Sequence, residues 1–309
     1  MNILSKLIDK LYLKQWSVGI INESIQDVIR NKKVSKKITW IHINNNFQFF
    51  ADPFIFKSES GNYSILYEEL DYHKQYGYIC QFDLDKKNNV VSKKIILDTK
   101  SHLSYPFIFY EDGSIYVFPE ASKSGKLTGY QFNKNEKTLS YKGDLINIPA
   151  VDSTILKYKN KYWIFCGMDG VDANKKLYIF HSENLWGPYK EHKENPVKET
   201  INGCRPAGNF IEVEGNLYRP AQNSGKYYGS SISIYKIIHL CEDKFIEEPY
   251  MSIHPAKTDY YNFGMHTINS IDKKIVVDGL VRRFLPLTQV RTFIRNKLLK
   301  KNNLYENAF

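Results

Sequence analysis

Five segments of the chain share one pattern of apolar and polar positions. Each begins with a polar residue at the head of an apolar strand. It passes through a turn rich in Gly, Asn, Asp and Lys and ends in a second, aromatic-rich strand. In the first segment, an apolar run over 51–56 is followed by a turn at 61–62 and a second run over 63–69. Short runs bounded by turn residues in this way predict β-hairpins.

The polar residues that open the segments recur at similar spacing. They are separated by 53, 47, 53 and 61 positions and are Asp52, Tyr105, Asp152, Arg205 and His266. A repeat of roughly 50 residues with four short strands is typical of a β-propeller blade. Strand-like runs between the hairpins, such as 78–82 and 177–180, supply the remaining strands. The sequence therefore predicts an all-β, five-bladed β-propeller over residues 35–284.

The two ends of the chain do not follow the repeat. Residues 1–34 are predicted to form a short helical lead-in. Residues 285–309 are predicted to form a basic amphipathic helix, because apolar residues recur at every fourth position from Val290 to Leu298 with arginines beside them. That helix is expected to pack on the flank of the propeller, or to touch an anionic membrane surface or an assembly partner.

Composition narrows the range of partners. The net charge of +10 fits nucleic acid, an anionic lipid surface or an acidic glycan. No helix-turn-helix pattern, zinc spacing or RNA-binding signature is present, so a nucleic-acid partner is not expected. Aromatic residues reach 15%, which favours β-structure and also suits stacking on sugar rings.

Cysteine usage and the N-terminal segment indicate where the protein works. The four cysteines are widely spaced and contain no Cys-x-x-Cys pair, which predicts neither a disulfide framework nor a zinc site. Charged residues interrupt the first 21 positions, unlike a signal peptide, and no apolar run approaches about 18 residues. A cytoplasmic location is expected, with peripheral contact at the inner face of the membrane as an extension of it.

The first strand of each propeller blade lines the central axis, so the five opening residues are expected to form a ring at one mouth of the channel. The ends of the second strands would lie beside this ring and contribute Glu69, Glu120, Arg219 and Asp278, with Gln222 and His102 nearby. Such a set of carboxylates, arginines and histidines indicates a ligand site. The structural alternative is that these groups only satisfy hydrogen bonds at the strand ends.

Two of the segment openings resemble a known enzyme family. Ala51-Asp52-Pro53-Phe54-Ile55 and Val151-Asp152-Ser153-Thr154-Ile155 are similar to the first-blade and third-blade aspartate motifs of glycoside hydrolase family 43. Nearly the whole chain also resembles the N-terminal domain of plant glucosamine inositolphosphorylceramide transferases and bacterial relatives. The motifs that carry this second resemblance, in order, are Gln15-Trp16-Ser17-Val18-Gly19, Asp52-Pro53-Phe54, His102-Leu103-Ser104-Tyr105-Pro106, Pro119-Glu120, Asp152-Ser153-Thr154, Gly187-Pro188-Tyr189, Asn195-Pro196-Val197, Arg205-Pro206-Ala207-Gly208, Arg219-Pro220-Ala221-Gln222, Tyr228-Gly229 and His266-Thr267.

The family-43 resemblance implies roles for two aspartates. Asp52 matches the general base, and Asp152 matches the carboxylate that orients or tunes the acid. In inverting chemistry an acid protonates the leaving oxygen while a base activates water on the opposite side. The family's acid is a glutamate at the start of the fourth blade, where this chain has Arg205. Ordinary hydrolysis is therefore in doubt, and Glu120 or Glu69 is the substitute acid.

Arg205 itself indicates an anionic ligand, because guanidinium grips carboxylate or phosphate bidentately. With Arg219 and His266 it would hold a uronic acid, a sugar phosphate or a nucleotide sugar; alternatively it pairs with Asp152 or Asp52. The expected substrate-binding residues are Glu69, His102, Tyr105, Arg205, Arg219, Gln222 and His266. The histidines lack metal-ligand spacing, so no cofactor is expected, although family-43-type propellers sometimes hold an axial calcium ion.

Two main functions follow from these features. The first is a carbohydrate-active enzyme of surface-polysaccharide or glycolipid biosynthesis that transfers or trims a sugar through Asp52, Asp152 and Glu120. The second is a non-catalytic module that binds an anionic glycan or nucleotide sugar for a separate glycosyltransferase. A scaffold that uses the propeller rim and the C-terminal helix is a third alternative.

Overall fold

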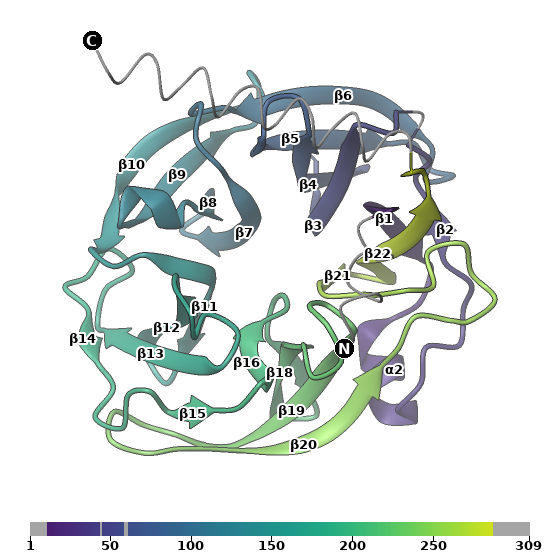
Figure 1. Cartoon of the computed structure of the whole chain (residues 1–309). Coiled ribbons are helices and arrows are strands. Elements are labelled where there is room, and N and C mark those ends of the chain that lie inside the picture. The colour runs from purple at the N-terminus through teal and green to yellow at the C-terminus, as the bar shows by residue number, and fades with distance from the viewer. Residues whose placement is uncertain (1–10, 44, 59–60, 287–309) are drawn as a thin grey trace, which may run out of the picture.

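A computed structural model describes residues 11–43, 45–58 and 61–286 of the chain. Within these ranges, five antiparallel sheets surround a central axis, so the predicted five-bladed β-propeller is confirmed (Figure 1). No helix among the described residues is long and apolar enough to cross a membrane. All four cysteines are free, as their spacing predicts.

Each blade follows the order of the chain from the axis outward. The first contains β3 (Gln48–Lys57), β4 (Tyr63–Asp71), β5 (Tyr76–Leu84) and β6 (Val90–Leu97). The second contains β7 (Ser104–Glu111), β8 (Ser114–Glu120), β9 (Leu127–Asn133) and β10 (Thr138–Ile146). The third contains β11 (Ala150–Tyr158), β12 (Lys161–Met168), β13 (Lys176–Ser182), β14 (Lys190–Glu191) and β15 (Lys198–Glu199). The fourth contains β16 (Asn202–Pro206), β17 (Ile211–Val213), β18 (Asn216–Asn223), β19 (Ser231–Leu240) and β20 (Phe245–Ile253).

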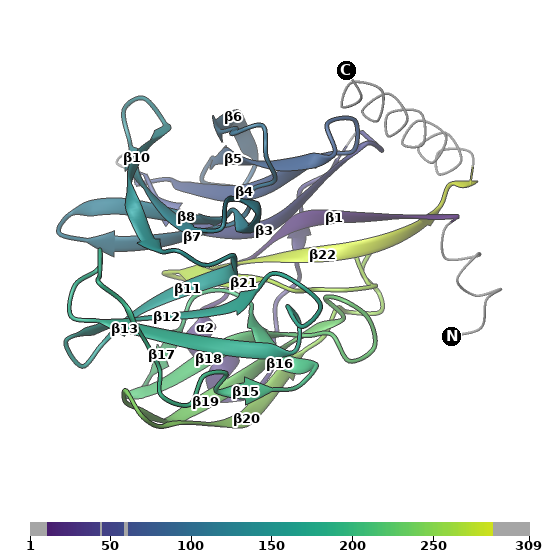
Figure 2. The ribbon, with the colours of Figure 1, turned by 60° about the vertical axis from the view of Figure 1, so that its left-hand side comes forward.

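The fifth blade joins the two ends of the propeller. It combines β21 (Ile268–Ile271) and β22 (Lys274–Phe284) with β1 (Tyr12–Ile21) and β2 (Thr39–Trp40). The pairing of β1 with β22 runs from Tyr12↔Phe284 to Ile21↔Ile275, and Figure 2 shows the two strands side by side. The N-terminal strand β1 thus closes the ring by pairing with the side of β22 that faces away from β21.

The predicted helical lead-in over residues 1–34 is therefore wrong for Tyr12–Ile21, which is a strand of the propeller. The helix in this region is α2 (Ile25–Asn31), and the hydroxyl of Ser24 caps it by accepting the backbone N–H of Asp27. Its buried face packs on the fourth and fifth blades. A short 3₁₀ turn, η1 (Ser122–Ser124), is the other helical element of the described residues. The predicted C-terminal helix, from residue 287 on, lies outside the described residues.

Aromatic side chains fill the space between blades. Phe54 of the first blade packs edge-to-face on Tyr105 of the second, with ring centroids 4.9 Å apart. Phe56 meets Phe132 in the same way at 5.3 Å. Such pairs add about 0.5–1.5 kcal/mol beyond the burial of their area. Packing between blades thus accounts for many of the aromatic residues.

The inner strands carry a repeated distortion where the predicted opening residues lie. Asp52, Tyr105 and Asp152 have positive φ angles of 50°, 42° and 49°. The strand register shifts at each of these positions, which marks a β-bulge. A left-handed conformation is uncommon for residues other than glycine, and bulges turn a side chain out of the regular alternation. The repeat read from the sequence therefore corresponds to a shared backbone geometry.

Candidate active site

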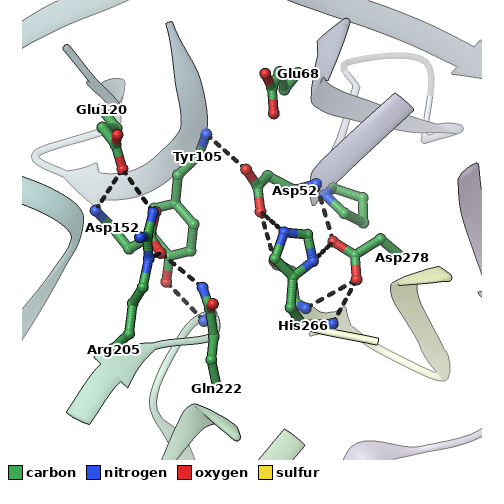
Figure 3. Close-up of polar contacts among 12 residues, drawn as sticks. Asp52, Glu68, Tyr105, Glu120, Asp152, Arg205, Gln222, His266 and Asp278 are labelled. Atoms are coloured by element: carbon green, nitrogen blue, oxygen red, sulfur yellow. Dashed lines mark hydrogen bonds and ion pairs between the residues drawn. The ribbon is translucent and has the colours of Figure 1, made fainter. Parts of the chain in front are cut away.

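Buried polar side chains gather at the start of the inner strands, in two groups (Figure 3). One group centres on Asp152 and includes Glu120, Arg205 and Gln222. The other centres on His266, with Asp52 and Asp278 on either side of its ring. The structure thus brings together the three predicted catalytic residues, Asp52, Asp152 and Glu120, with several of the predicted binding residues.

Arg205 is committed to two carboxylates of the first group. Its Nε contacts Oδ2 of Asp152, and its Nη2 lies 3.4 Å from Oε2 of Glu120. Gln222 donates from Nε2 to the same Asp152 oxygen at 2.7 Å. Of the two sequence-based readings of Arg205, pairing with Asp152 is the one that the structure shows. Its guanidinium compensates buried negative charge, and its side chain is only 15% exposed.

Glu120 holds the backbone of the neighbouring blade as well as facing Arg205. Its Oε2 accepts the backbone N–H of Asp152 at 3.1 Å. Burial and the charge of Asp152 raise the pKa of Glu120 well above its ordinary value, against the opposing effect of Arg205. The raised pKa favours the protonated form of this carboxyl group.

Asp52 is held by contacts from two other blades. Its Oδ1 accepts the hydroxyl of Thr267 at 2.7 Å, and its Oδ2 accepts the backbone N–H of Tyr105 at 3.2 Å. Burial raises the pKa of Asp52 to about 6, with His266 opposing the rise and the nearby carboxylates reinforcing it. Asp52 is therefore an oriented carboxylate that is largely ionised at neutral pH.

His266 is a buried cation between two aspartates. Its Nδ1 lies 2.5 Å from Oδ2 of Asp278 and its Nε2 lies 3.5 Å from Oδ1 of Asp52. Burial lowers its pKa, but the two carboxylates outweigh burial and bring the pKa to about 9. The ring stacks on Trp16, with centroids 4.1 Å apart. This arrangement fixes the ring and its charge.

The same three residues are the group among the described residues that comes nearest to a metal site. Asp52, His266 and Asp278 each offer one atom within 4.8 Å of the others. Calcium prefers six to eight oxygen ligands. Here, however, Oδ1 of Asp278 already accepts the backbone N–H groups of His266 and Thr267. His266 would also have to lose its proton to bind a metal. These residues therefore do not fit the axial calcium ion that the family-43 resemblance implies.

Tyr105 supports the site from behind. Its side chain is fully buried, and its hydroxyl accepts the backbone N–H of Gly208 at 2.7 Å and shares a hydrogen bond with Thr154. The predicted role of this side chain in substrate binding is not borne out by its position. Its backbone N–H, by contrast, orients Asp52.

Two other predicted residues lie away from the axial groups. Glu69 is buried between strands of the first blade, where it accepts the hydroxyls of Tyr67 and Tyr78 and pairs with Lys93. Arg219 pairs with Glu247 inside the fourth blade and donates to the carbonyl of Gly203. Successive strand residues point to opposite faces. The predictions that Glu69 and Arg219 lie at the axis are therefore wrong, because each side chain is on the other face of its strand.

Glu68 is the acidic residue that the sequence interpretation missed. It lies opposite Ala51 in the strand register, as Glu120 lies opposite Ser104. Figure 3 shows its carboxyl pointing toward the space between the two groups. Burial and the charges of Asp52, Glu120, Asp152 and Asp278 raise its pKa well above the ordinary value. Aligning the two hairpins on their bulges, instead of on their turns, would have found it.

Two partly accessible side chains border the buried groups. His102, predicted as a binding residue, is 31% exposed, and its Nε2 lies 3.8 Å from Oε1 of Glu68. Tyr228 is 42% exposed; its ring lies under the guanidinium of Arg205 at 5.3 Å and edge-on to His266 at 5.4 Å. An accessible tyrosine beside buried acids suits contact with a sugar ring. In the sequence, Tyr228 belongs to the Tyr228-Gly229 motif of the family resemblance, but it is not among the predicted site residues.

Comparison with known proteins shows the family of the chain as a whole. The family described as "Glucosamine inositolphosphorylceramide transferase 1, N-terminal" matches residues 32–275. The transferase of that name from Oryza sativa subsp. japonica is 32% identical over 238 residues. The match covers 75% of this chain but 32% of the rice protein, so the chain spans about a third of its relative's length.

Solved structures support the same fold. Zg3597, a family 117 glycoside hydrolase from Zobellia galactanivorans, matches with a TM-score of 0.55 and 12% identity, over 90% of this chain and 92% of its own. The GH43 protein BlXynB from Bacillus licheniformis matches with a TM-score of 0.52 and 13% identity, over 72% of this chain and 50% of its own. At such identities the likeness shows the propeller fold alone. On the sequence match, the chain belongs to the family of the N-terminal domain of glucosamine inositolphosphorylceramide transferase 1.

Proposed function

We propose that this chain is a carbohydrate-active enzyme that makes or breaks a glycosidic bond at the axial site. One observation carries the proposal: Asp52, an oriented carboxylate with a pKa of about 6, shares the site with carboxyl groups whose pKa is raised well above the ordinary value. Neighbouring titratable groups whose environments give them different pKa values are candidates for the acid and the base of a reaction. The family membership supports a carbohydrate-active role.

The residues divide the work as follows. Asp52 takes the proton from the incoming hydroxyl group, which belongs to water in trimming and to an acceptor alcohol in transfer. A protonated carboxyl group, Glu120 or a neighbour, gives a proton to the leaving oxygen. Asp152 and Arg205 form a fixed ion pair beside Glu120 that tunes this acid. Tyr228 and His102 border the sugar.

The wider role is a proposal of the same kind. The relatives are named glucosamine inositolphosphorylceramide transferases, and the present chain spans about a third of the rice protein's length. We propose a role in glycolipid or surface-polysaccharide biosynthesis, in the cytoplasm at the inner face of the membrane, with a separate glycosyltransferase as partner. Its own part in that process is the handling of the sugar in the propeller.

A second candidate is a binding module without turnover. It is favoured by Arg205, which takes the fourth-blade position where the family-43 resemblance places the acid. The expected preference for an anionic ligand has less support, because Arg205 is already paired and Arg219 lies elsewhere. Five carboxyl groups share the site with Arg205 and His266 (Figure 3). A module of this kind would therefore hold a neutral sugar through its hydroxyl groups.

The two candidates are separated by following the protein with glycosides, sugar phosphates and nucleotide sugars by NMR. New anomeric signals that disappear in Asp52→Asn and Asp152→Asn establish the enzyme. Glu69→Gln is the matched control, since Glu69 is a buried acid on the same blade that faces away from the axis. Saturation transfer from the protein to a sugar without any new signal over hours establishes the binding module instead.

A further inference from the structure

A repeated hydrogen bond links neighbouring blades around the axis. The carboxylate on the second strand of one blade accepts the backbone N–H of the bulged residue on the first strand of the next. Asp278 of the fifth blade accepts from Asp52 at 3.2 Å. Glu120 of the second blade accepts from Asp152 at 3.1 Å. These two acids are thus tied to the backbone.

Glu68 occupies the corresponding place in the first blade but does not make this bond. The backbone N–H that it would accept, that of Tyr105, donates to Asp52. Glu68 is only 5% exposed, and among the described residues its buried Oε1 has no hydrogen-bond partner. A buried oxygen without a partner costs free energy, so such a group is unusual in a purely structural role. Because Asp52 accepts the backbone N–H of Tyr105, Glu68 is not tied to the backbone as Asp278 and Glu120 are.

The surroundings of Glu68 leave Oε1 of its carboxyl group without a hydrogen-bond partner among the described residues. A Cβ atom on Gly77 would lie 2.4 Å from Oε1, so the strand beside it needs a glycine there. The imidazole Nε2 of His102 lies 3.8 Å from Oε1 of Glu68. Its Nδ1 accepts the backbone N–H of Gly77 at 2.9 Å, which places the imidazole proton on Nε2, facing Glu68. At 3.8 Å the Nε2–H of a neutral His102 is too far from Oε1 of Glu68 for a hydrogen bond, so the two side chains would have to move closer for it to donate.

We propose that Glu68 is the group that donates the proton to the leaving oxygen, with His102 as its positioning residue. This inference rests on the proposed function. The C1–O bond of the glycoside breaks, and its electron pair stays on the leaving oxygen, which takes the proton of Glu68. The oxygen of the incoming hydroxyl group bonds to C1 and gives its proton to Asp52. Solvent then returns a proton to Glu68 and removes one from Asp52.

Glu120 is the less suitable donor because its contacts hold it in place. Its Oε2 accepts a backbone N–H and faces the guanidinium of Arg205. Both contacts oppose the rise in its pKa and tie its side chain to its neighbours, which makes Glu120 a poorer proton donor. Glu68 has neither contact, and in Figure 3 its carboxyl group points toward the space between the Asp152 group and the His266 group with no contact drawn to it.

The first test measures the proton directly and needs no substrate. Infrared difference spectra at pH 7 compare the protein with Glu68→Gln, an isosteric variant, and with Glu69→Gln as the control. Glu68→Gln is expected to remove the carbonyl band of a protonated carboxylic acid, and Glu69→Gln is expected to leave it. If Glu68→Gln removes no such band, Glu68 is ionised and the assignment is overturned, whether or not any glycoside is turned over.

The second test uses the leaving group. Dinitrophenyl glycosides need little protonation on departure, whereas methyl glycosides need a full proton. Glu68→Gln is expected to slow methyl glycosides by about 10²–10⁴-fold and to spare dinitrophenyl glycosides. Equal losses on both would reject the role. If the wild-type protein turns over neither class, the trimming form of the proposed function fails, while the infrared result still decides whether Glu68 stores a proton.

Discussion

The backbone N–H of Tyr105 donates to Oδ2 of Asp52 at 3.2 Å, so the second blade holds the carboxylate of the first. Both residues have left-handed backbone conformations, with φ angles of 42° and 50°. Strained conformations persist only where the surrounding structure fixes them, and here packing between blades does so. The orientation of Asp52 is therefore a property of the closed ring.

Tyr105→Phe is expected to destabilise the protein without removing any group from the axial site. The change leaves the backbone N–H of Gly208 without its acceptor, since the hydroxyl accepts it at 2.7 Å. An orphaned buried donor costs about 1–3 kcal/mol. Urea denaturation measures this loss, and Tyr141→Phe, at a tyrosine that is 64% exposed, is the control. Equal midpoints for the two variants would show that the hydroxyl of Tyr105 is dispensable.

Arg205→Gln is expected to lower the free energy of unfolding by about 3–5 kcal/mol, because Asp152 and Glu120 lose their buried counter-ion. Thermal and urea denaturation provide the measurement. Arg30→Gln is the control, since Arg30 pairs with Glu214 on the exposed surface. If Arg205 serves an anionic ligand instead, the variant keeps its stability and loses only its saturation-transfer signal from a uridine diphosphate sugar.

Gly77→Ala is expected to disturb Glu68 and the local backbone together. The added Cβ would lie 2.4 Å from Oε1 of Glu68 and 2.6 Å from the carbonyl oxygen of Leu103. Overpacking of this kind costs about 1–3 kcal/mol, and turnover should fall further as Glu68 is displaced. Denaturation and rate measurements on Gly143→Ala, where the nearest atom is 3.3 Å away on Trp186, give the comparison. Wild-type values for Gly77→Ala would show that Glu68 can move freely.

Stability is expected to fall as the pH rises through two windows. His266 has a folded-state pKa of about 9 against an ordinary 6.5, so its contribution is complete below pH 6.5 and is lost by about pH 9. At 1.36 kcal/mol per pKa unit this is on the order of 3 kcal/mol. Asp52, at about 6 against 3.8, retains a proton that the unfolded chain releases, so stability also falls between those values.

Urea denaturation at pH values from 6 to 9 checks the upper window. The slope should flatten in His266→Gln and persist in His254→Gln, which changes an exposed histidine. An unchanged slope in His266→Gln would mean that His266 is not the group that titrates. The variant is also expected to be less stable at pH 6, because Asp278 and Asp52 lose their cation.

The sequence predicted the number of blades and several residues at their axial ends, because the repeat places a polar residue at the bulges of Asp52, Tyr105 and Asp152. The sequence-based prediction failed where the structure of a segment depends on the strand that it pairs with. The run Tyr12–Ile21 becomes a strand by pairing with β22 at the other end of the chain, and no local pattern encodes that pairing. Glu69 was chosen over Glu68 for a related reason: a shift of one residue reverses the face of a strand. The contacts of Arg205 with Asp152 and Glu120 also depend on three blades meeting.

The most direct test of the account is the rate of glycoside turnover as a function of pH in the wild-type protein and in Asp52→Asn. The account predicts a wild-type rate that rises through pH of about 6, as Asp52 loses its proton, and falls at higher pH as the acid ionises. It predicts that Asp52→Asn lowers the rate by about 10²–10⁴-fold and abolishes the rising limb. A rising limb retained at a wild-type rate in Asp52→Asn would contradict it.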